Sequence, residues 1–326
     1  MMNIQLQQFL DDIGIEGHHI KISKAIWAFY DEFLKERKPV KVESDFNNIF
    51  IENEYIKEIV NVLKRKKAII LRGVPGVGKT FVINDIISNS FDNIGENGMQ
   101  MIQFHQSYAY EEFVEGLRPQ MNGGYDIEKG IFYEICDTAK DNPDLNYFLI
   151  IDEINRGNMS KIFGELLMLI ENDKRDDYSV TLPYSKEEFI VPGNLYIIGT
   201  MNTADRSLSL VDYAMRRRFS FMTLEPAFDT EKFNAYLKNN MGLKSGEISL
   251  INRTMVEVNN LIVDRLGKDF QIGHSYFIAD KETITNFTTW FHEIVKYEIM
   301  PMIEEYFFDD SSTVEEIATL FGEAYA

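Results

Sequence analysis

The stretch that decides the fold is LRGVPGVGKT, residues 71–80. An apolar run, residues 68–71, enters it, and a helix-like stretch, residues 81–88, leaves it. The spacing G-x-x-x-x-G-K-T between a strand and a helix is typical of a phosphate-binding loop. Its glycines let backbone N–H groups point at phosphate oxygens, and the following helix adds the positive end of its dipole. The residues predicted to bind the nucleotide are Gly73, Val74, Pro75, Gly76, Val77, Gly78, Lys79 and Thr80.

Two side chains of this loop carry its chemistry. Lys79 can reach the terminal phosphates, and the hydroxyl group of Thr80 can ligate Mg²⁺. The alternative is a glycine-rich turn with a chance lysine, and such a turn does not need the strand and the helix that flank the loop here. We therefore predict a nucleoside triphosphate site with Mg²⁺ as its cofactor.

An acidic pair follows the third predicted strand. Residues 146–151, NYFLII, are followed at once by Asp152 and Glu153. Asp152 would hold Mg²⁺ through water, and Glu153 would orient and polarise the attacking water. An acidic pair can also simply cap a helix. Its position at the end of a buried strand favours nucleotide hydrolysis.

A polar side chain also ends the strand predicted over residues 194–199. Asn202 follows that strand, and the carboxyl ends of neighbouring parallel strands meet at one edge of a sheet, where ligands bind. Asn202 could therefore contact the terminal phosphate or the attacking water. An asparagine in a strand-ending turn is also common without any nucleotide.

Three arginines, Arg216, Arg217 and Arg218, lie at the end of a helix predicted over residues 208–216. Cations at a helix C-terminus interact favourably with its dipole, which is the simpler interpretation. The alternative is an arginine finger, a guanidinium group that a neighbouring subunit supplies to the phosphoryl group in ring ATPases. Three arginines beside a strand start are more than a cap requires, and this favours the finger.

The composition limits the function. The 326 residues are 45% hydrophobic and carry a formal charge of −19. A chain with this net negative charge has no overall attraction for DNA or anionic membranes. Any DNA contact must therefore be local or come from a partner. The single Cys136 excludes an internal disulfide, and no apolar stretch approaches the roughly 20 residues of a membrane span. We expect a soluble, cytoplasmic protein without membrane contact.

Three regions are predicted from the pattern along the chain. Residues 1–45 form a short N-terminal helical extension with an aromatic stripe, and residues 46–225 alternate strands and helices. That alternation predicts an α/β domain with a parallel sheet sandwiched by helices. Residues 226–326 read as a small α-helical lid domain. Within the core we expect one continuous helix over residues 159–171, and within the lid a helix over residues 283–298.

Several segments resemble the McrB family, the AAA+ motor subunits of McrBC modification-dependent restriction systems. The most specific is MNTADRS, residues 201–207, which is similar to that family's signature loop. The likeness extends from about residue 46 to about residue 310. It also includes INRGN at 154–158, KIFGE at 161–165, VDYAMRRRF at 211–219 and IGHSYF at 272–277.

The resemblance implies an AAA+ P-loop fold and a hexameric ring motor that prefers GTP to ATP. It further implies stimulation by an McrC-like endonuclease subunit and translocation of DNA before cleavage. By matching position, hydrolysis would involve Asn155, Asn202 and Asp205, and the fingers acting in trans would be Arg217 and Arg218. His274 falls near the lid segment that faces the nucleotide. The first 45 or so residues are short for a domain that binds modified DNA, so either this chain lacks that domain or target recognition resides on another chain.

Two rival functions share part of this pattern. An ATP-driven protein remodeller of the MoxR type would have the same phosphate loop, acidic pair and arginines, but residues 201–207 argue against it. A nucleotide-gated assembly scaffold would bind without turnover, and it would not need Glu153. The chain has no N-K-x-D element of the small GTPases, so other groups must select the base if GTP is preferred.

Overall fold

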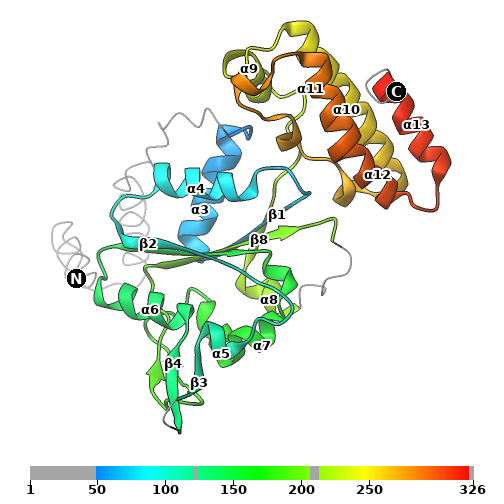
Figure 1. The fold of residues 1–326 in the computed structure, drawn as a ribbon. Coiled ribbons are helices and arrows are strands. Elements are labelled where there is room, and N and C mark those ends of the chain that lie inside the picture. The colour runs from blue at the N-terminus through cyan, green and yellow to red at the C-terminus, as the bar shows by residue number, and fades with distance from the viewer. Residues whose placement is uncertain (1–48, 121–122, 206–212, 323–326) are drawn as a thin grey trace, which may run out of the picture. The chain divides into compact units, whose positions relative to one another are not determined.

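The structure is a computed structural model that describes residues 49–120, 123–205 and 213–322 (Figure 1). The chain divides into two units, Met1–Ser44 and Asp45–Ala326, and every described residue belongs to the second. The helices and the aromatic stripe expected in residues 1–45 lie outside the described residues. So do residues 206–212, which end the loop at 201–207 and begin the helix predicted over 208–216.

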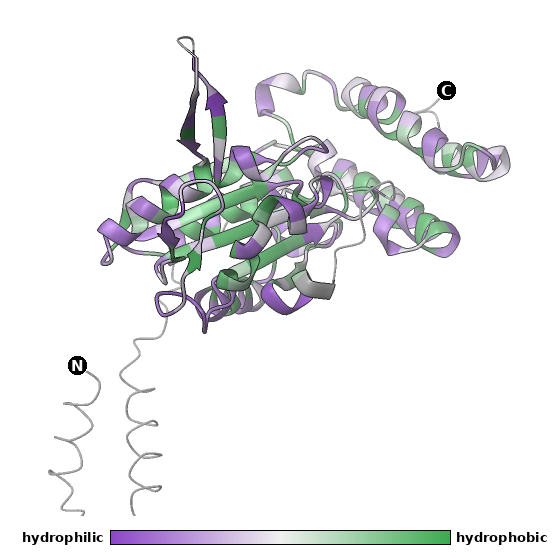
Figure 2. Cartoon of the chain, turned by 90° about the horizontal axis from the view of Figure 1, so that it is seen from below, coloured by the Kyte–Doolittle hydropathy of each residue, from purple (hydrophilic) through white to green (hydrophobic). Residues whose placement is uncertain are grey.

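A five-stranded parallel sheet forms the centre of the first half, in the order β2-β5-β8-β1-β9. The three inner strands β5, β8 and β1 read as apolar runs, and the middle of the sheet is coloured hydrophobic (Figure 2). Such runs predict burial on both faces, and the structure confirms the α/β class. The bounds are Ile94–Gln103 for β2, Asn146–Asp152 for β5, Leu195–Asn202 for β8, Ala68–Gly73 for β1 and Ser220–Thr223 for β9.

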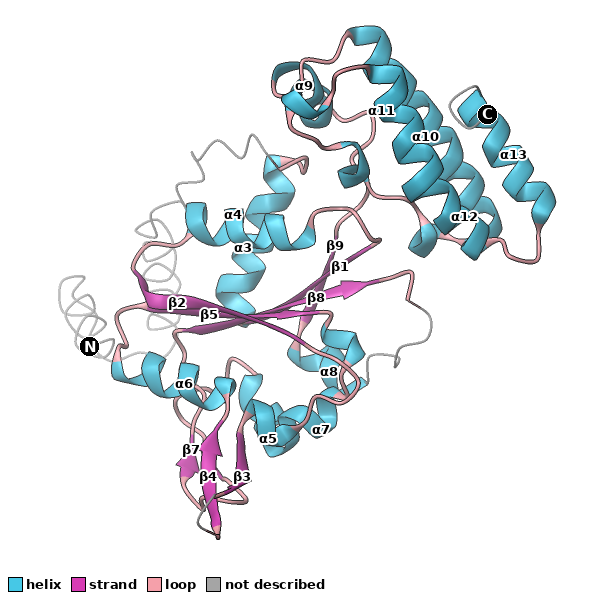
Figure 3. Ribbon diagram, viewed as in Figure 1, coloured by secondary structure: helices cyan, strands magenta, loops and turns pink. Residues whose placement is uncertain are grey.

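Helices cover both faces of this sheet (Figures 1 and 3). On one face lie α3, Asn53–Lys66, and α4, Lys79–Ser90. The other face carries α5, Tyr110–Phe113, α6, Ile131–Asp141, α7, Met159–Phe163, and α8, Tyr213–Arg218.

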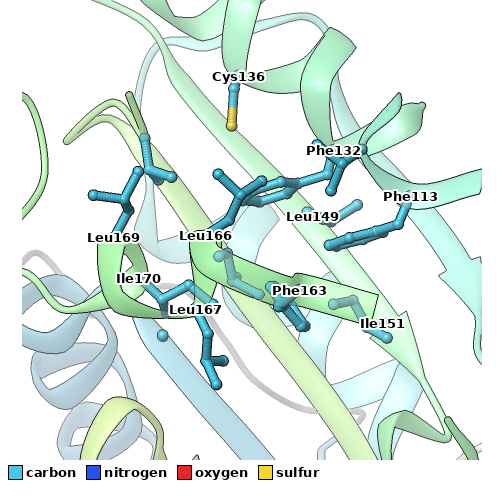
Figure 4. Packing of buried hydrophobic residues seen from close by; sticks show 14 of the residues in the cluster. Phe113, Phe132, Cys136, Leu149, Ile151, Phe163, Leu166, Leu167, Leu169 and Ile170 are labelled. Atoms are coloured by element: carbon cyan, nitrogen blue, oxygen red, sulfur yellow. The ribbon is translucent and has the colours of Figure 1, made fainter. Parts of the chain in front are cut away.

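Aromatic side chains fill the core on this second face. Phe113 stacks on Phe132 with ring centroids 4.8 Å apart and meets Phe163 edge-on at 4.7 Å. All three rings pack near Leu149 and Ile151 of β5 (Figure 4). Aromatic pairs in these geometries add to the stabilisation that burial provides.

The single helix predicted over residues 159–171 is wrong. Helix α7 ends at Phe163, and a 3₁₀ helix, η2, continues from Gly164 to Ile170. Gly164 has φ +51°, a left-handed conformation that glycine adopts without strain and that interrupts the α-helix. Periodic burial of the apolar residues survives the break, and this is why the pattern alone suggested one helix.

Two small antiparallel hairpins accompany the sheet. The first, β3 (Glu115–Pro119) with β4 (Tyr125–Lys129), was not predicted, because most of its side chains are exposed and give no alternation of apolar and polar residues. The second pairs β6 (Val180–Thr181) with β7 (Glu188–Phe189).

The C-terminal part of the chain is helical and has its own core. Phe233, Ile251, Trp290 and Ile303 belong to one buried cluster. The helix predicted over residues 283–298 begins only at Phe287, because the side chain of Asn286 caps it by accepting a hydrogen bond from Thr289 N. None of the described helices has the length and apolarity to cross a membrane. The helices are α9, Glu231–Asn239; α10, Ser245–Leu266; α11, Phe287–Ile294; the π-helical turn η6, Val295–Ile299; α12, Met300–Tyr306; and α13, Ser311–Phe321.

Candidate nucleotide site

The predicted phosphate loop joins the end of β1 to the start of α4. Gly73 ends the strand and Lys79 begins the helix. Gly76 and Gly78 have φ of +79° and +71°, in the left-handed region that side chains with a Cβ rarely adopt. The glycines at these two positions are therefore a requirement of the backbone path.

Lys79 lies buried inside this loop. Its Nζ donates to Gly73 O at 3.0 Å, to Val74 O at 3.1 Å and to Asn202 Oδ1 at 2.6 Å. Burial lowers the pKa of Lys79 to about 8, although the charges of Asp152 and Glu153 act in the opposite direction. The ammonium group is thus held among weak acceptors, and an anionic phosphate oxygen would be a stronger partner.

Strand register brings the predicted polar residues to one edge of the sheet. Gly73 of β1 lies opposite Asn202 of β8, and Asp152 ends β5 on the other side of β8. We refer to this as the carboxyl edge. There Asn202 accepts from Lys79, and its Nδ2 donates to Glu153 Oε1 at 3.2 Å. One asparagine therefore connects the phosphate-loop lysine to the acidic pair.

Thr200 holds the acidic pair in place. Its buried hydroxyl group donates to Asp152 Oδ1 at 2.5 Å and accepts the backbone N–H of Glu153 at 3.1 Å. Glu153 has φ +49° and ψ +46°, a left-handed conformation that costs a non-glycine residue roughly 1–3 kcal/mol. Sequence reasoning missed Thr200. The sequence did offer a clue to Thr200. It lies two residues before Asn202, and side chains two residues apart in a strand point to the same face of the sheet.

The 3₁₀ helix η1, Ile154–Arg156, brings two more residues to the carboxyl edge. Arg156 pairs with the Glu153 carboxylate, and its Nη2 lies 3.6 Å from Asp205 Oδ2. Asn155 is 5% exposed, and its Oδ1 has no hydrogen-bond partner among the described residues. Of these, Asn155 and Asp205 were predicted, whereas Arg156 lay in a quoted segment without an assigned role.

The chemistry of the donors fits Mg²⁺. Thr80 lies in the first turn of α4, and Asp152 ends β5, so each offers a hard oxygen of the kind that this ion prefers. No group of three or more His, Cys, Asp or Glu suited to a metal occurs in the described part of the chain. The donor set therefore suits an ion completed by phosphate oxygens and water and does not suit an all-protein cage.

A cavity of about 410 Å³ adjoins the phosphate loop. Its walls are largely apolar and include aromatic side chains, as is usual for small-molecule sites, and its size suits a nucleobase with its ribose. Segments from three parts of the chain contribute. They are residues 49–51 before α3, residues Val77, Gly78, Phe81 and Val82 of the loop and α4, and residues Tyr236, Asn240, His274, Ser275 and Ile278 of the helical part.

The helical part is bonded directly to the phosphate loop. Ser275 N donates to Gly76 O at 2.8 Å, and a Cβ added to Gly273 would lie 2.1 Å from the carbonyl carbon of Gly76. His274, which stands between Gly273 and Ser275 in the sequence, is buried. Its Nδ1 accepts a hydrogen bond from Ala227 N at 3.0 Å. Burial lowers the pKa of His274 to about 4, so the ring is neutral at physiological pH. The predicted lid segment therefore lines the cavity.

The arginines lie at the opposite edge of the sheet. Helix α8 leads into β9, whose Ser220 pairs with Ile69 near the start of β1. We refer to this as the amino edge. A strand rises about 3.3 Å per residue, so Ser220 lies about 13 Å along the sheet from the level of Gly73. Arg217 and Arg218 of one subunit are thus not brought together with its own phosphate loop.

The two arginines differ in their surroundings. Arg218 Nε lies 3.3 Å from Glu171 Oε1, and its side chain is 17% exposed. Arg217 Nη2 lies 3.9 Å from Glu171 Oε2, and its side chain is 77% exposed. Glu171, immediately after η2, was not singled out from the sequence.

Comparison with known proteins agrees with this geometry. The AAA domain of the dynein-related subfamily matches residues 68–219, and the McrB alpha-helical lid domain matches residues 250–315. The type IV methyl-directed restriction enzyme EcoKMcrB subunit of Escherichia coli K12 is 50% identical over 278 residues, 82% of this chain and 60% of that protein. The type II restriction enzyme BsuMI component YdiS of Bacillus subtilis 168 is 25% identical over 300 residues, 78% of this chain and 83% of that protein.

The coverage of these matches is unequal. The chain spans about three fifths of the length of the E. coli relative, yet most of the chain takes part in that match. The matched AAA region contains the phosphate loop, the acidic pair and Asn202, and the matched lid region contains His274. The chain therefore carries an AAA domain followed by an McrB-type lid domain, and most of it is similar to the E. coli McrB subunit.

Proposed function

We propose that this chain is the motor subunit of an McrBC-type restriction complex. It hydrolyses a nucleoside triphosphate and prefers GTP to ATP. The observation that carries the proposal is the position of Asn202, hydrogen-bonded at once to the phosphate-loop lysine and to the acidic pair. A site that only binds nucleotide needs Lys79 but has no use for a polarising glutamate beside it.

Each side chain has a role in hydrolysis. Lys79 leaves its carbonyl partners and pairs with the terminal phosphates. Mg²⁺, held by Thr80 and through water by Asp152, would supply positive charge at the phosphate oxygens. Glu153 accepts a proton from the attacking water, and Asn202 orients that water or the terminal phosphate. Arg156 forms an ion pair with the Glu153 carboxylate, so Glu153 would act on the attacking water once this ion pair opens.

The arginines point to action across a subunit interface. Their position at the amino edge separates them from their own phosphates, while charge developing on the transferred phosphoryl group calls for a guanidinium. A neighbouring subunit that places its amino edge against this carboxyl edge would satisfy both requirements. The same arrangement repeated around an axis closes a ring, for which six subunits are the number that the McrB resemblance implies.

Preference for GTP and association with an McrC-like endonuclease are proposed from the similarity to McrB. The E. coli relative is named a subunit of a methyl-directed restriction enzyme, which supports a role in a complex that acts on DNA. Hydrolysis in this chain would then drive DNA translocation before the partner cleaves. A formal charge of −19 makes tight binding of duplex DNA by this chain alone unexpected.

The deciding experiment measures hydrolysis of GTP and ATP side by side over a range of protein concentrations, with and without the McrC-like protein. We expect GTP to be hydrolysed faster, specific activity to rise steeply with protein concentration, and the partner to stimulate turnover. A preference for ATP with no response to the partner would support the MoxR-like remodeller. Binding of both nucleotides without turnover would support the assembly scaffold.

A further inference from the structure

Glu171 is placed where it can control the arginines. Its carboxylate is mostly buried, with the side chain 19% exposed, and it lies between two cations of α8. The closer contact, 3.3 Å, is to the shielded Arg218, and the longer one, 3.9 Å, is to the exposed Arg217. Ion pairs with a buried partner are screened less by water than surface pairs, so the Arg218 contact is the stronger anchor.

The backbone under Glu171 is fixed to the sheet. The preceding residue, Ile170, accepts a hydrogen bond at 3.1 Å from Nε of Arg175, whose side chain is fully buried. The Arg175 guanidinium also donates to the carbonyls of Leu195 and Pro192 at the start of β8. One arginine thus connects the end of η2 to the amino edge of the sheet, so Glu171 projects from a backbone with little freedom.

We propose that Glu171 is the positioning residue of the arginine finger. It anchors Arg218 and thereby aims the exposed Arg217 at the nucleotide of the neighbouring subunit. This inference rests on the proposed hydrolysis in trans, and it divides the two arginines into an anchor and a finger. Because Glu171 is in the subunit that provides the finger, its loss impairs the neighbour's site and leaves its own site intact.

The test uses the full chain with Glu171→Gln, which removes the charge at nearly constant size, and Glu171→Asp, which keeps the charge on a shorter side chain. Misplacement of a catalytic group by about 1 Å can cost on the order of 10²-fold in rate. We expect kcat of Glu171→Gln to fall roughly 10- to 100-fold, with KM and nucleotide affinity nearly unchanged. Glu171→Asp should retain an intermediate rate.

The matched control is Glu316→Gln. It breaks another glutamate–arginine pair, that of Glu316 with Arg265 at 3.8 Å, far along the chain in α13. It should leave kcat unchanged. Thermal unfolding of all variants tests folding. Glu171→Gln should still unfold cooperatively, at a lower temperature than wild type, because it removes the charge that faces the shielded Arg218.

Mixed rings separate a positioning role from a structural one. Glu171→Gln mixed with Glu153→Gln should regain turnover, because some interfaces then combine an intact Glu153 with an intact finger. Glu171→Gln mixed with Arg217→Ala should regain none, since both lack a working finger. A merely damaged subunit would not be rescued by Glu153→Gln, and that result would overturn the inference.

Two outcomes distinguish this inference from the proposal beneath it. If Arg217→Ala is strongly impaired but Glu171→Gln turns over at the wild-type rate, Glu171 has no positioning role and hydrolysis in trans still stands. If Arg217→Ala itself retains full turnover in assembled rings, the finger is wrongly assigned, and the role of Glu171 is overturned with it.

Discussion

The carboxyl and amino edges of the same sheet are built in contrasting ways. At the carboxyl edge, Lys79, Asn202 and Glu153 are joined to one another by hydrogen bonds within one subunit. At the amino edge, Arg217 is largely exposed, and its Nη2 lies 3.9 Å from Glu171 Oε2. The first edge is connected by hydrogen bonds within the chain, while the second presents a cation outward. Under the proposed hydrolysis in trans, the contrast means that one subunit would hold most of a hydrolytic site and also the part that a neighbour's site needs.

The largest effect is expected from Lys79→Ala at the carboxyl edge. Removing the ammonium group leaves the phosphates without their main cation from the protein and leaves Asn202 Oδ1 without its donor. Nucleotide binding and turnover should both be lost, as measured with a fluorescent nucleotide analogue and by phosphate release. Lys57→Ala, at an exposed ion pair in α3, is the control and should behave as wild type. Undiminished binding by Lys79→Ala would place the site elsewhere.

Arg217→Ala tests the amino edge. Fingers of this type contribute about 10³–10⁵-fold to turnover, so kcat should fall steeply while nucleotide affinity is kept. Glu153→Gln should also bind nucleotide, and it should lose about 10²–10⁴-fold in kcat, the usual range for acid–base groups. Mixing the two inactive variants should restore part of the activity if the edges belong to different subunits. The contrast between the edges fails if co-assembled mixtures show no recovery.

Thr200→Val sharpens the description of the carboxyl edge. The substitution keeps the shape of the side chain but removes the hydroxyl group that bonds both Asp152 and the Glu153 backbone. Asp152 and Glu153 are still present in this variant and lose only a group that positions them. We therefore expect a smaller loss in kcat, about 10-fold, and weaker binding of Mg²⁺ in an Mg²⁺ titration of the activity. Thr181→Val, on the exposed strand β6, is the matched control. An unchanged kcat and Mg²⁺ titration would show that Thr200 is dispensable.

The smallest effect is expected for the pH dependence of folding stability, which we attribute to His274, where the helical part docks at the carboxyl edge. His274 has a pKa of about 4 in the folded protein and about 6.5 when exposed, so the unfolded chain binds more protons between these values. Stability should therefore fall as pH decreases from about 6.5 towards 4, by at most about 3 kcal/mol from this residue. His274→Asn keeps an acceptor for Ala227 N but does not titrate.

Urea unfolding at pH 7.5 and pH 5.0 measures this difference. The wild type should lose more stability between the two values than His274→Asn, while the two should differ little in their pH response above pH 7. Equal losses for both proteins would show that His274 is not the group that links protonation to folding here.

Local sequence was sufficient for the phosphate loop and the strands. Gly76 and Gly78 occupy left-handed positions that few other residues tolerate, and the apolar runs of β1, β5 and β8 can only be buried. The polar residues that follow those strands, Asp152, Glu153 and Asn202, had to meet at one edge once the strands were parallel. These features depend on backbone geometry and on burial, which a short stretch of sequence specifies.

Contacts between distant segments were decided only by tertiary structure. The strand order places Thr200 beside Asp152, and the fold of residues 164–171 places Glu171 beside Arg218. Docking of Gly273 on the phosphate loop likewise depends on the packing of the helical part. The break at Gly164 was hidden because the apolar residues stay buried on both sides of it. Periodicity reports which residues are buried, whereas register and packing decide which of them touch.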